Sequence, residues 1–206
     1  MDSYLPAIYQ TDGRIERGYD PFSLLFKERI VFLGMPINDQ VSNAIVAQLL
    51  YLDQQSPDRE IQLYINCPGG EIYPGLAIYD TMQMVRAPIR TIAVGWTASL
   101  GTVLLAAGTD KKRMALPHAT IHMHPAGGGA RGYAPDVEIQ YKELKRMQDL
   151  LHHILARHTK QPVSRIAEDF DRDYFMDPAA AVEYGIIDEV LTIADEKQPV
   201  EEKKEG

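Results

Sequence analysis

Short apolar runs alternate along the chain with longer segments whose apolar residues recur at helical spacing. The runs predict buried strands at 28–34, 61–66 and 91–94. The segments that follow them predict helices at 38–55, 71–85 and 102–107. Three strand–helix units in succession predict an α/β fold with parallel strands and right-handed crossovers.

The second half of the chain is less regular and contains one long amphipathic segment. Apolar residues from Val137 to Ile154 form one stripe of a helix predicted at about 136–158. Its length suggests that it projects from the body or packs against another subunit. Shorter elements are predicted as strands at 113–116, 119–123 and 186–191, and as helices from 162 and at 177–184.

Composition places this pattern in a folded, intracellular setting. The 206 residues are 45% hydrophobic and carry a net charge of −8, which argues against a nucleic-acid surface. No apolar run reaches about 18 residues, so no membrane-spanning helix is expected. A single cysteine, Cys67, fits a reducing compartment, and we expect the protein in the cytoplasm.

Ser99 lies where a predicted strand passes through a segment rich in glycine and small residues, Gly95 to Gly101, into a helix. A serine there has a short side chain among free backbone N–H groups, which would stabilise an oxyanion formed by nucleophilic attack. Serine is also one of the best helix N-caps. These residues alone leave both interpretations open.

A second loop, Asn66 to Gly70, ends the neighbouring predicted strand. Two adjacent glycines let a ligand approach the backbone, although they match no phosphate-binding motif. Because parallel strands end at the same edge of a sheet, this loop is expected to meet Ser99. The N–H groups of Gly70 and Leu100 would then be two oxyanion donors.

A serine nucleophile needs a histidine base and a carboxylate to orient it. His122 and His124 share one face of a predicted strand, and Asp171 and Asp173 precede an aromatic pair. The pattern alone does not choose within either pair. The remaining histidines are expected in a turn (His118) and on the solvated face of the long helix (His152, His153 and His158).

As a set, these residues resemble the family of Clp protease proteolytic subunits (ClpP) over about residues 4–192. The segments that carry the resemblance are KERIVFL (27–33), LYINCPGG (63–70), IYDTMQ (78–83), Ala98-Ser99, ALP (115–117), DVEIQ (136–140) and AVEYG (181–185). The resemblance implies a ClpP/crotonase-like α/β fold of repeated β-α-β units with a long projecting "handle" at about 125–158. It divides the chain into an N-terminal axial loop segment at 1–20, a peptidase domain at 21–193 and a charged tail at 194–206, which we expect to be disordered.

The resemblance also assigns roles within the site. By position, Ser99 matches the family nucleophile, His124 the base and Asp173 the acid, while Gly70 and Leu100 match the oxyanion hole. The implied activity is serine-type endopeptidase. Several positions depart from the family pattern. His122 stands where an apolar residue is usual, and Pro125-Ala126 follows His124 where the family has Gln-Pro. Cys67 replaces the usual serine, and Lys160 stands where a glycine commonly ends the long helix.

The implied assembly is a homo-oligomer of two stacked seven-membered rings, possibly mixed with a paralogue. Asp171 and Arg172 match the pair that links the rings. Tyr64, Met84, Ile92 and Leu191 match positions that dock a hexameric AAA+ unfoldase such as ClpX, ClpA or ClpC. That partner would use ATP and deliver unfolded polypeptides, since this chain has no Walker motif. We expect no metal, cofactor, nucleic acid or membrane partner for the chain itself.

Two other functions are compatible with parts of this pattern. A catalytically silent ring subunit of a mixed Clp complex would share the fold, but the three catalytic positions are all filled here. A crotonase-like acyl-CoA enzyme would share the paired N–H donors, but it would not require Ser99, His124 and Asp173 together.

Overall fold

A five-stranded parallel sheet forms the centre of the molecule. The structure is a computed structural model that describes residues 8–12, 15–129 and 131–191. Its strands run in the order β10-β7-β5-β4-β3, and each neighbouring pair is parallel. Their bounds are β3 Ile30–Leu33, β4 Ile61–Ile65, β5 Ile89–Ala93, β7 Arg113–Ala115 and β10 Glu189–Val190. The predicted α/β fold with parallel strands is confirmed.

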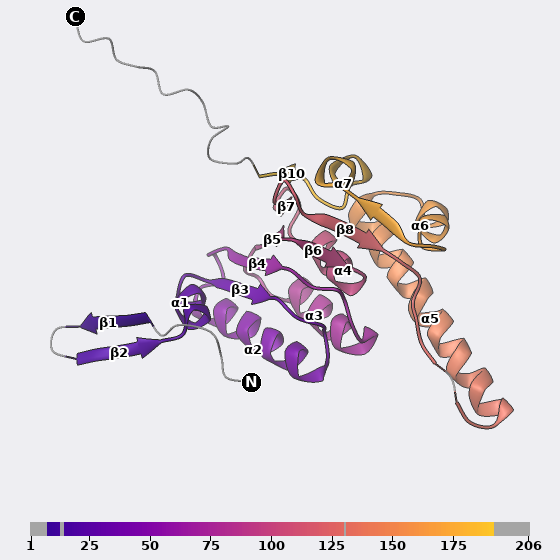
Figure 1. The fold of residues 1–206 in the computed structure, drawn as a ribbon, viewed down its shortest axis with the longest axis horizontal. Helices are drawn as coiled ribbons and strands as arrows, with labels where there is room; N and C mark the ends of the chain where they lie inside the picture. The colour runs from indigo at the N-terminus through magenta and orange to yellow at the C-terminus, as the bar shows by residue number, and fades with distance from the viewer. Residues whose placement is uncertain (1–7, 13–14, 130, 192–206) are drawn as a thin grey trace, which may run out of the picture.

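Helices α2 and α3 lie along one side of this sheet, and α5 extends away from the body (Figure 1). The helices are α1 Pro21–Lys27, α2 Asp39–Gln55, α3 Ile72–Met84, α4 Leu100–Ala106, α5 Ala134–Thr159, α6 Val163–Asp169 and α7 Pro178–Tyr184. Val31, Leu63 and Thr91 pair across the sheet and are buried, which gives the core one continuous layer. Over the described residues, none of the helices is long and apolar enough to cross a membrane.

A second, three-stranded sheet holds the residues around the candidate site. It contains β6 Trp96–Ala98, β8 Thr120–Met123 and β9 Tyr174–Met176. β6 and β8 are parallel, whereas β8 and β9 are antiparallel. The chain leaves the large sheet at the end of β5 and enters β6 two residues later, and Ser99 directly follows β6.

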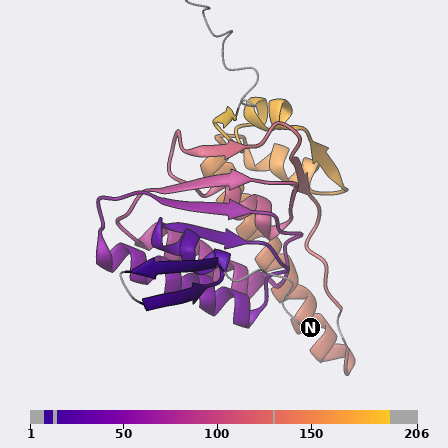
Figure 2. The ribbon, with the colours of Figure 1, turned by 60° about the vertical axis from the view of Figure 1, so that its left-hand side comes forward.

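The amino-terminal segment forms an antiparallel hairpin of β1 Ile8–Asp12 and β2 Ile15–Tyr19. In Figure 2 it lies in front of the large sheet and helices. The predicted axial loop segment at 1–20 therefore contains regular structure at 8–12 and 15–19. The predicted disordered tail at 194–206 lies outside the described residues.

Several short elements differ from the sequence prediction. Helix α1 was not expected, although Asp20 accepts a hydrogen bond from the Ser23 N–H and Pro21 occupies the first turn, both typical of a helix start. Strands β6 and β9, each three residues long, were not expected. The strand expected at 186–191 shrinks to β10 because the N–H groups of Ile186 and Ile187 donate to the Ala181 carbonyl of α7.

Candidate active site

Ser99 occupies a strained turn between β6 and α4. Its φ of 56° and ψ of −123° are unusual for a residue other than glycine. Its side chain makes no capping hydrogen bond to α4, so capping does not explain this serine. The turn is held through the backbone, because the Ser99 N–H donates to the His122 carbonyl at 2.9 Å. Such strain persists where the surrounding structure enforces it, and it is typical of functional sites.

The glycine loop meets this turn, as the adjacent strands predict. The Ala98 N–H donates to the Cys67 carbonyl at 2.9 Å, which ties β6 to the end of β4. Gly69 has a φ of 93°, and a Cβ atom there would lie 2.5 Å from the Cβ of Ser99. Gly70 has a φ of 150°, and its Cβ would run into the Ile37 carbonyl. Only glycine fits this approach of the two chain segments.

Two backbone donors are available beside Ser99. The N–H groups of Gly70 and Leu100 donate to no acceptor within the described part of the chain. Ser99, Gly70 and Leu100 all line one cavity of about 260 Å³. The other lining residues are Pro68, Ile72, Val103, His124, Ala126, Gly127, Leu151 and Phe170. A polar end with free N–H groups and apolar walls suits a substrate carbonyl and an adjoining side chain.

His124 lines this cavity with Ser99, but Asp173 is bonded elsewhere. The Nδ1 atom of His124 lies 2.8 Å from the Pro125 carbonyl oxygen, which fixes the tautomer with hydrogen on Nδ1. Asp173 Oδ1 lies 2.9 Å from Nε2 of His122. The structure therefore brings Ser99, His124, Gly70 and Leu100 together and places Asp173 on the neighbouring histidine. The predicted hydrogen bonds from Ser99 to His124 and from His124 to Asp173 are not formed here.

The remaining chemically active side chains lie apart from the cavity or are inert. Burial raises the pKa of the Cys67 thiol, so this residue is a neutral packing group. The expected solvated face of the long helix is wrong for two histidines: His152 is buried and His158 bonds to the Tyr79 hydroxyl, while His153 is exposed. Among the described residues, no three His, Cys, Asp or Glu side chains converge as a metal site requires.

The predicted assembly residues differ in exposure: Asp171, Arg172 and Met84 are exposed, Tyr64 and Leu191 are half-buried, and Ile92 is fully buried, at 1%. Asp171 and Arg172 are exposed and paired at 3.2 Å. Tyr64 and Ile92 are register partners on neighbouring strands, on the side of the sheet opposite the buried Leu63 layer. Met84 is exposed at the end of α3, and Leu191 follows β10, where its N–H bonds to the Ala115 carbonyl.

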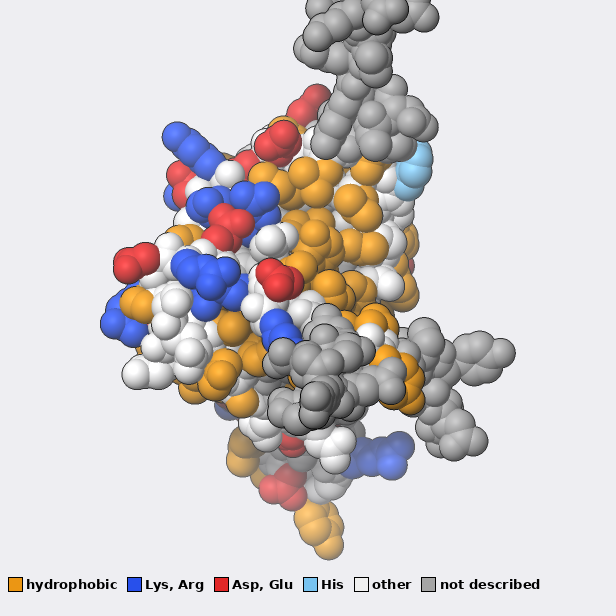
Figure 3. Space-filling model, turned by 90° about the vertical axis from the view of Figure 1, so that its left-hand side faces the viewer, with side chains coloured by type: hydrophobic (Ala, Val, Ile, Leu, Met, Phe, Trp, Pro, Cys, Tyr) orange, Lys and Arg blue, Asp and Glu red, His pale blue; other side chains and the backbone are white. Residues whose placement is uncertain are grey.

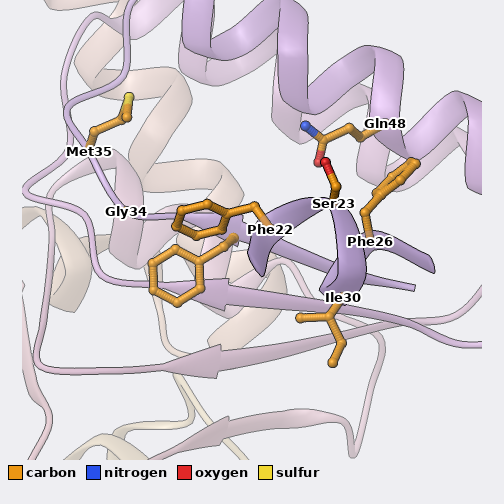
Figure 4. Close-up of a pocket in the computed structure, with 8 residues that line it drawn as sticks. Phe22, Ser23, Phe26, Ile30, Gly34, Met35 and Gln48 are labelled. Atoms are coloured by element: carbon orange, nitrogen blue, oxygen red, sulfur yellow. The ribbon is translucent and has the colours of Figure 1, made fainter. Parts of the chain in front are cut away.

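An apolar groove of about 510 Å³ lies beside Tyr64. Phe22 and Phe26 of α1 and Met35, which follows β3, border it (Figure 4). Phe32, another lining residue, stacks on the Tyr64 ring at a centroid distance of 6.5 Å. Viewed from the side of the amino-terminal hairpin, hydrophobic side chains gather in a band beside a region of mixed charge (Figure 3).

A family model described as Clp protease matches residues 13–194 of the chain. An ATP-dependent Clp protease proteolytic subunit from Dehalococcoides mccartyi is 55% identical over 190 residues, which cover 92% of this chain and 95% of that protein. A protein of the same name from Deinococcus radiodurans is 50% identical over 200 residues, covering 97% and 98% of the two chains. The chain therefore belongs to the Clp protease family, as its sequence motifs predicted.

Proposed function

We propose that this chain is the proteolytic subunit of an ATP-dependent Clp protease and acts as a serine endopeptidase. The observation that carries the proposal is the Ser99 turn: a strained, non-capping serine that shares a cavity with His124 and two free N–H groups. The names of the relatives from Dehalococcoides mccartyi and Deinococcus radiodurans support the same activity.

In the proposed reaction, Ser99 attacks the scissile carbonyl while His124 accepts its proton and later returns it to the leaving amine. The bond from His124 Nδ1 to the Pro125 carbonyl supports this role, because it leaves Nε2 unprotonated and basic. The Gly70 and Leu100 N–H groups stabilise the oxyanion, and loss of one such donor typically lowers the rate about 100- to 1,000-fold. Asp173 fixes the His124 tautomer and stabilises the imidazolium when it bonds to this histidine.

We further propose the chamber of two stacked seven-membered rings. The outer half of α5 supports it, because Ile139 and Tyr141 are 66% and 62% exposed on the projecting helix. Exposed apolar residues of this kind mark interaction surfaces. Asp171 and Arg172 would contribute ring contacts, and the segment 125–158 would interlock between rings.

Tyr64, Met84 and Leu191 are proposed to dock a hexameric AAA+ unfoldase such as ClpX, ClpA or ClpC, and the buried Ile92 would support Tyr64 from the neighbouring strand. The apolar groove beside Tyr64 supports a hydrophobic docking surface. The unfoldase would consume ATP and feed unfolded polypeptide, so the chain itself would use no cofactor. A cytoplasmic location fits such a partner.

Peptide hydrolysis by the purified chain tests the proposal. Wild type is expected to cleave a fluorogenic peptide, and Ser99→Ala to lower kcat at least about 1,000-fold. Native mass spectrometry of the same samples would report the ring state. A silent subunit would form rings and remain inactive alone, yet support hydrolysis when mixed with an active paralogue. Hydrolysis that survives Ser99→Ala would contradict the proposed nucleophile.

A further inference from the structure

His122 is a second imidazole next to the candidate base, and the proposed mechanism gives it no role. Its ring is buried and lies flat against Phe175, at a centroid distance of 4.0 Å and an angle of 4°. Trp96 stacks near it at 6.2 Å and 18°. Among the described residues, the buried Nδ1 atom has no hydrogen-bond partner, and the one polar contact of this ring is from Nε2 to Asp173 at 2.9 Å.

The strand register places Asp173 within reach of both histidines. In the β8–β9 ladder, His122 is opposite Phe175 and Met123 is opposite Tyr174. Continued by one residue, the same register sets Asp173 opposite His124. Because side chains alternate along strands, Asp173 and the two histidines share one face, with His124 as the direct neighbour and His122 as the diagonal one. Asp173 nevertheless bonds to the diagonal partner.

The ring centroids of His122 and His124 are 5.3 Å apart. The Asp173 carboxylate can therefore pass from one imidazole to the other with little movement. The Asp173 side chain is 69% exposed, and in the described structure its one hydrogen bond is to His122. His122, in contrast, is held by the aromatic rings on its faces. The mobile member of the pair is therefore Asp173.

This pairing matters for the reaction because, within the part of the chain that the structure describes, Nδ1 of His124 contacts only the neutral Pro125 carbonyl. A carbonyl can fix the tautomer, but a carboxylate also stabilises the positive charge that His124 gains when it takes the serine proton. While Asp173 is bonded to His122, the Pro125 carbonyl holds His124 in the required tautomer, but no carboxylate stabilises its positive charge.

We propose that His122 is a positioning residue that competes with His124 for Asp173, so that transfer of the carboxylate to His124 completes the catalytic site. The inference rests on the proposed serine-protease function. Activity of the site then scales with the fraction of molecules in which Asp173 is bonded to His124.

Variants at position 122 test the competition through the second-order rate of Ser99 labelling by diisopropyl fluorophosphate and through kcat for a peptide. His122→Phe keeps the stacked ring and removes the donor, and it is expected to raise both rates about 3- to 10-fold. His122→Gln restores an N–H donor and is expected to return the rates toward those of wild type. In an Asp173→Ala background, His122→Phe should give no gain.

His152→Phe is the matched control, because His152 is also buried, has an unpartnered ring nitrogen and packs on an aromatic ring, Phe170. It should give no gain. An equal gain in this variant, an unchanged or lower rate in a folded His122→Phe protein, or a gain that survives Asp173→Ala would overturn the inference. Wild type that is not labelled on Ser99 would instead overturn the proposed function.

A measurement on the unmodified chain covers the case in which His122→Phe does not fold. Crystal structures of wild type before and after diisopropyl fluorophosphate labelling should show the Asp173 carboxylate leaving His122 Nε2 for His124 Nδ1. A labelled protein with Asp173 still bonded to His122 would overturn the inference.

Discussion

The two ends of the candidate site are built differently. At the nucleophile end, Ser99 and the Gly69–Gly70 loop are fixed by backbone hydrogen bonds and by contacts that admit only glycine. At the other end, Asp173 is exposed and bonded through one side-chain contact. In the proposed reaction, the backbone would set where attack and oxyanion binding occur, while the exchange of Asp173 between His122 and His124 would set how strongly the base is supported.

The largest effect should come from removing the base itself. His124→Ala is expected to lower kcat about 10,000-fold or more, and Asp173→Ala distinctly less, because the Pro125 carbonyl still holds the His124 tautomer. Peptide hydrolysis under saturating substrate measures both. Equal losses of kcat in the two variants would show that Asp173 already supports His124 fully. The candidate site would then not differ in rigidity between its Ser99 end and its Asp173 end.

A smaller but still large effect is expected at the glycine loop. Gly69→Ala places a Cβ against Ser99 at a φ of 93°, so the turn must shift. We expect kcat to fall about 100-fold, in line with the loss of one oxyanion donor. Gly129→Ala is the control, since Gly129 does not line the cavity and a Cβ there meets nothing within 4 Å. Comparable kcat values for the two variants would contradict the rigid nucleophile end.

The smallest effect concerns stability in acid, far from both ends. Burial lowers the pKa of His158 to about 4 from its usual 6.5, and Arg157, Arg113 and Lys160 add to the shift. Between these values the unfolded chain binds a proton that the folded chain does not. The free energy of unfolding should therefore fall as pH drops from about 6.5 to about 4.

Chemical denaturation across this pH range checks the His158 prediction. His158→Gln should flatten the dependence, while His153→Gln, at an exposed position of the same helix, should leave it unchanged. The comparison of these two variants separates the effect of acid on the stability of the fold from its effect on activity at the candidate site. A pH dependence that persists in His158→Gln would assign it to other groups.

The meeting of the glycine loop with Ser99 could be predicted from the sequence because it depends on two neighbouring strands and the residues that directly follow them. Two adjacent parallel strands, each ending in glycines or small residues, must meet at one edge of the sheet, and Gly70 and Ser99 do so. The helices with clear periodicity, such as α2, were predicted to within a residue or two of their ends.

The other end depends on contacts that no local pattern encodes. Asp173 bonds to His122, whose ring stacks on Phe175, a residue of a strand too short to predict. The signal that was available is His122 itself, a histidine where the related family has an apolar residue. Burial of His152 and His158 also depends on packing against Phe170 and Tyr79, which are distant in sequence.

The central claim is that Ser99 is the nucleophile of a protease, and mapping of a fluorophosphonate label tests it most directly. Mass spectrometry of the digested wild-type chain should find the phosphonyl group on Ser99, and the Ser99→Ala protein should remain unlabelled. A label on another residue, or one that persists in Ser99→Ala, would contradict the account.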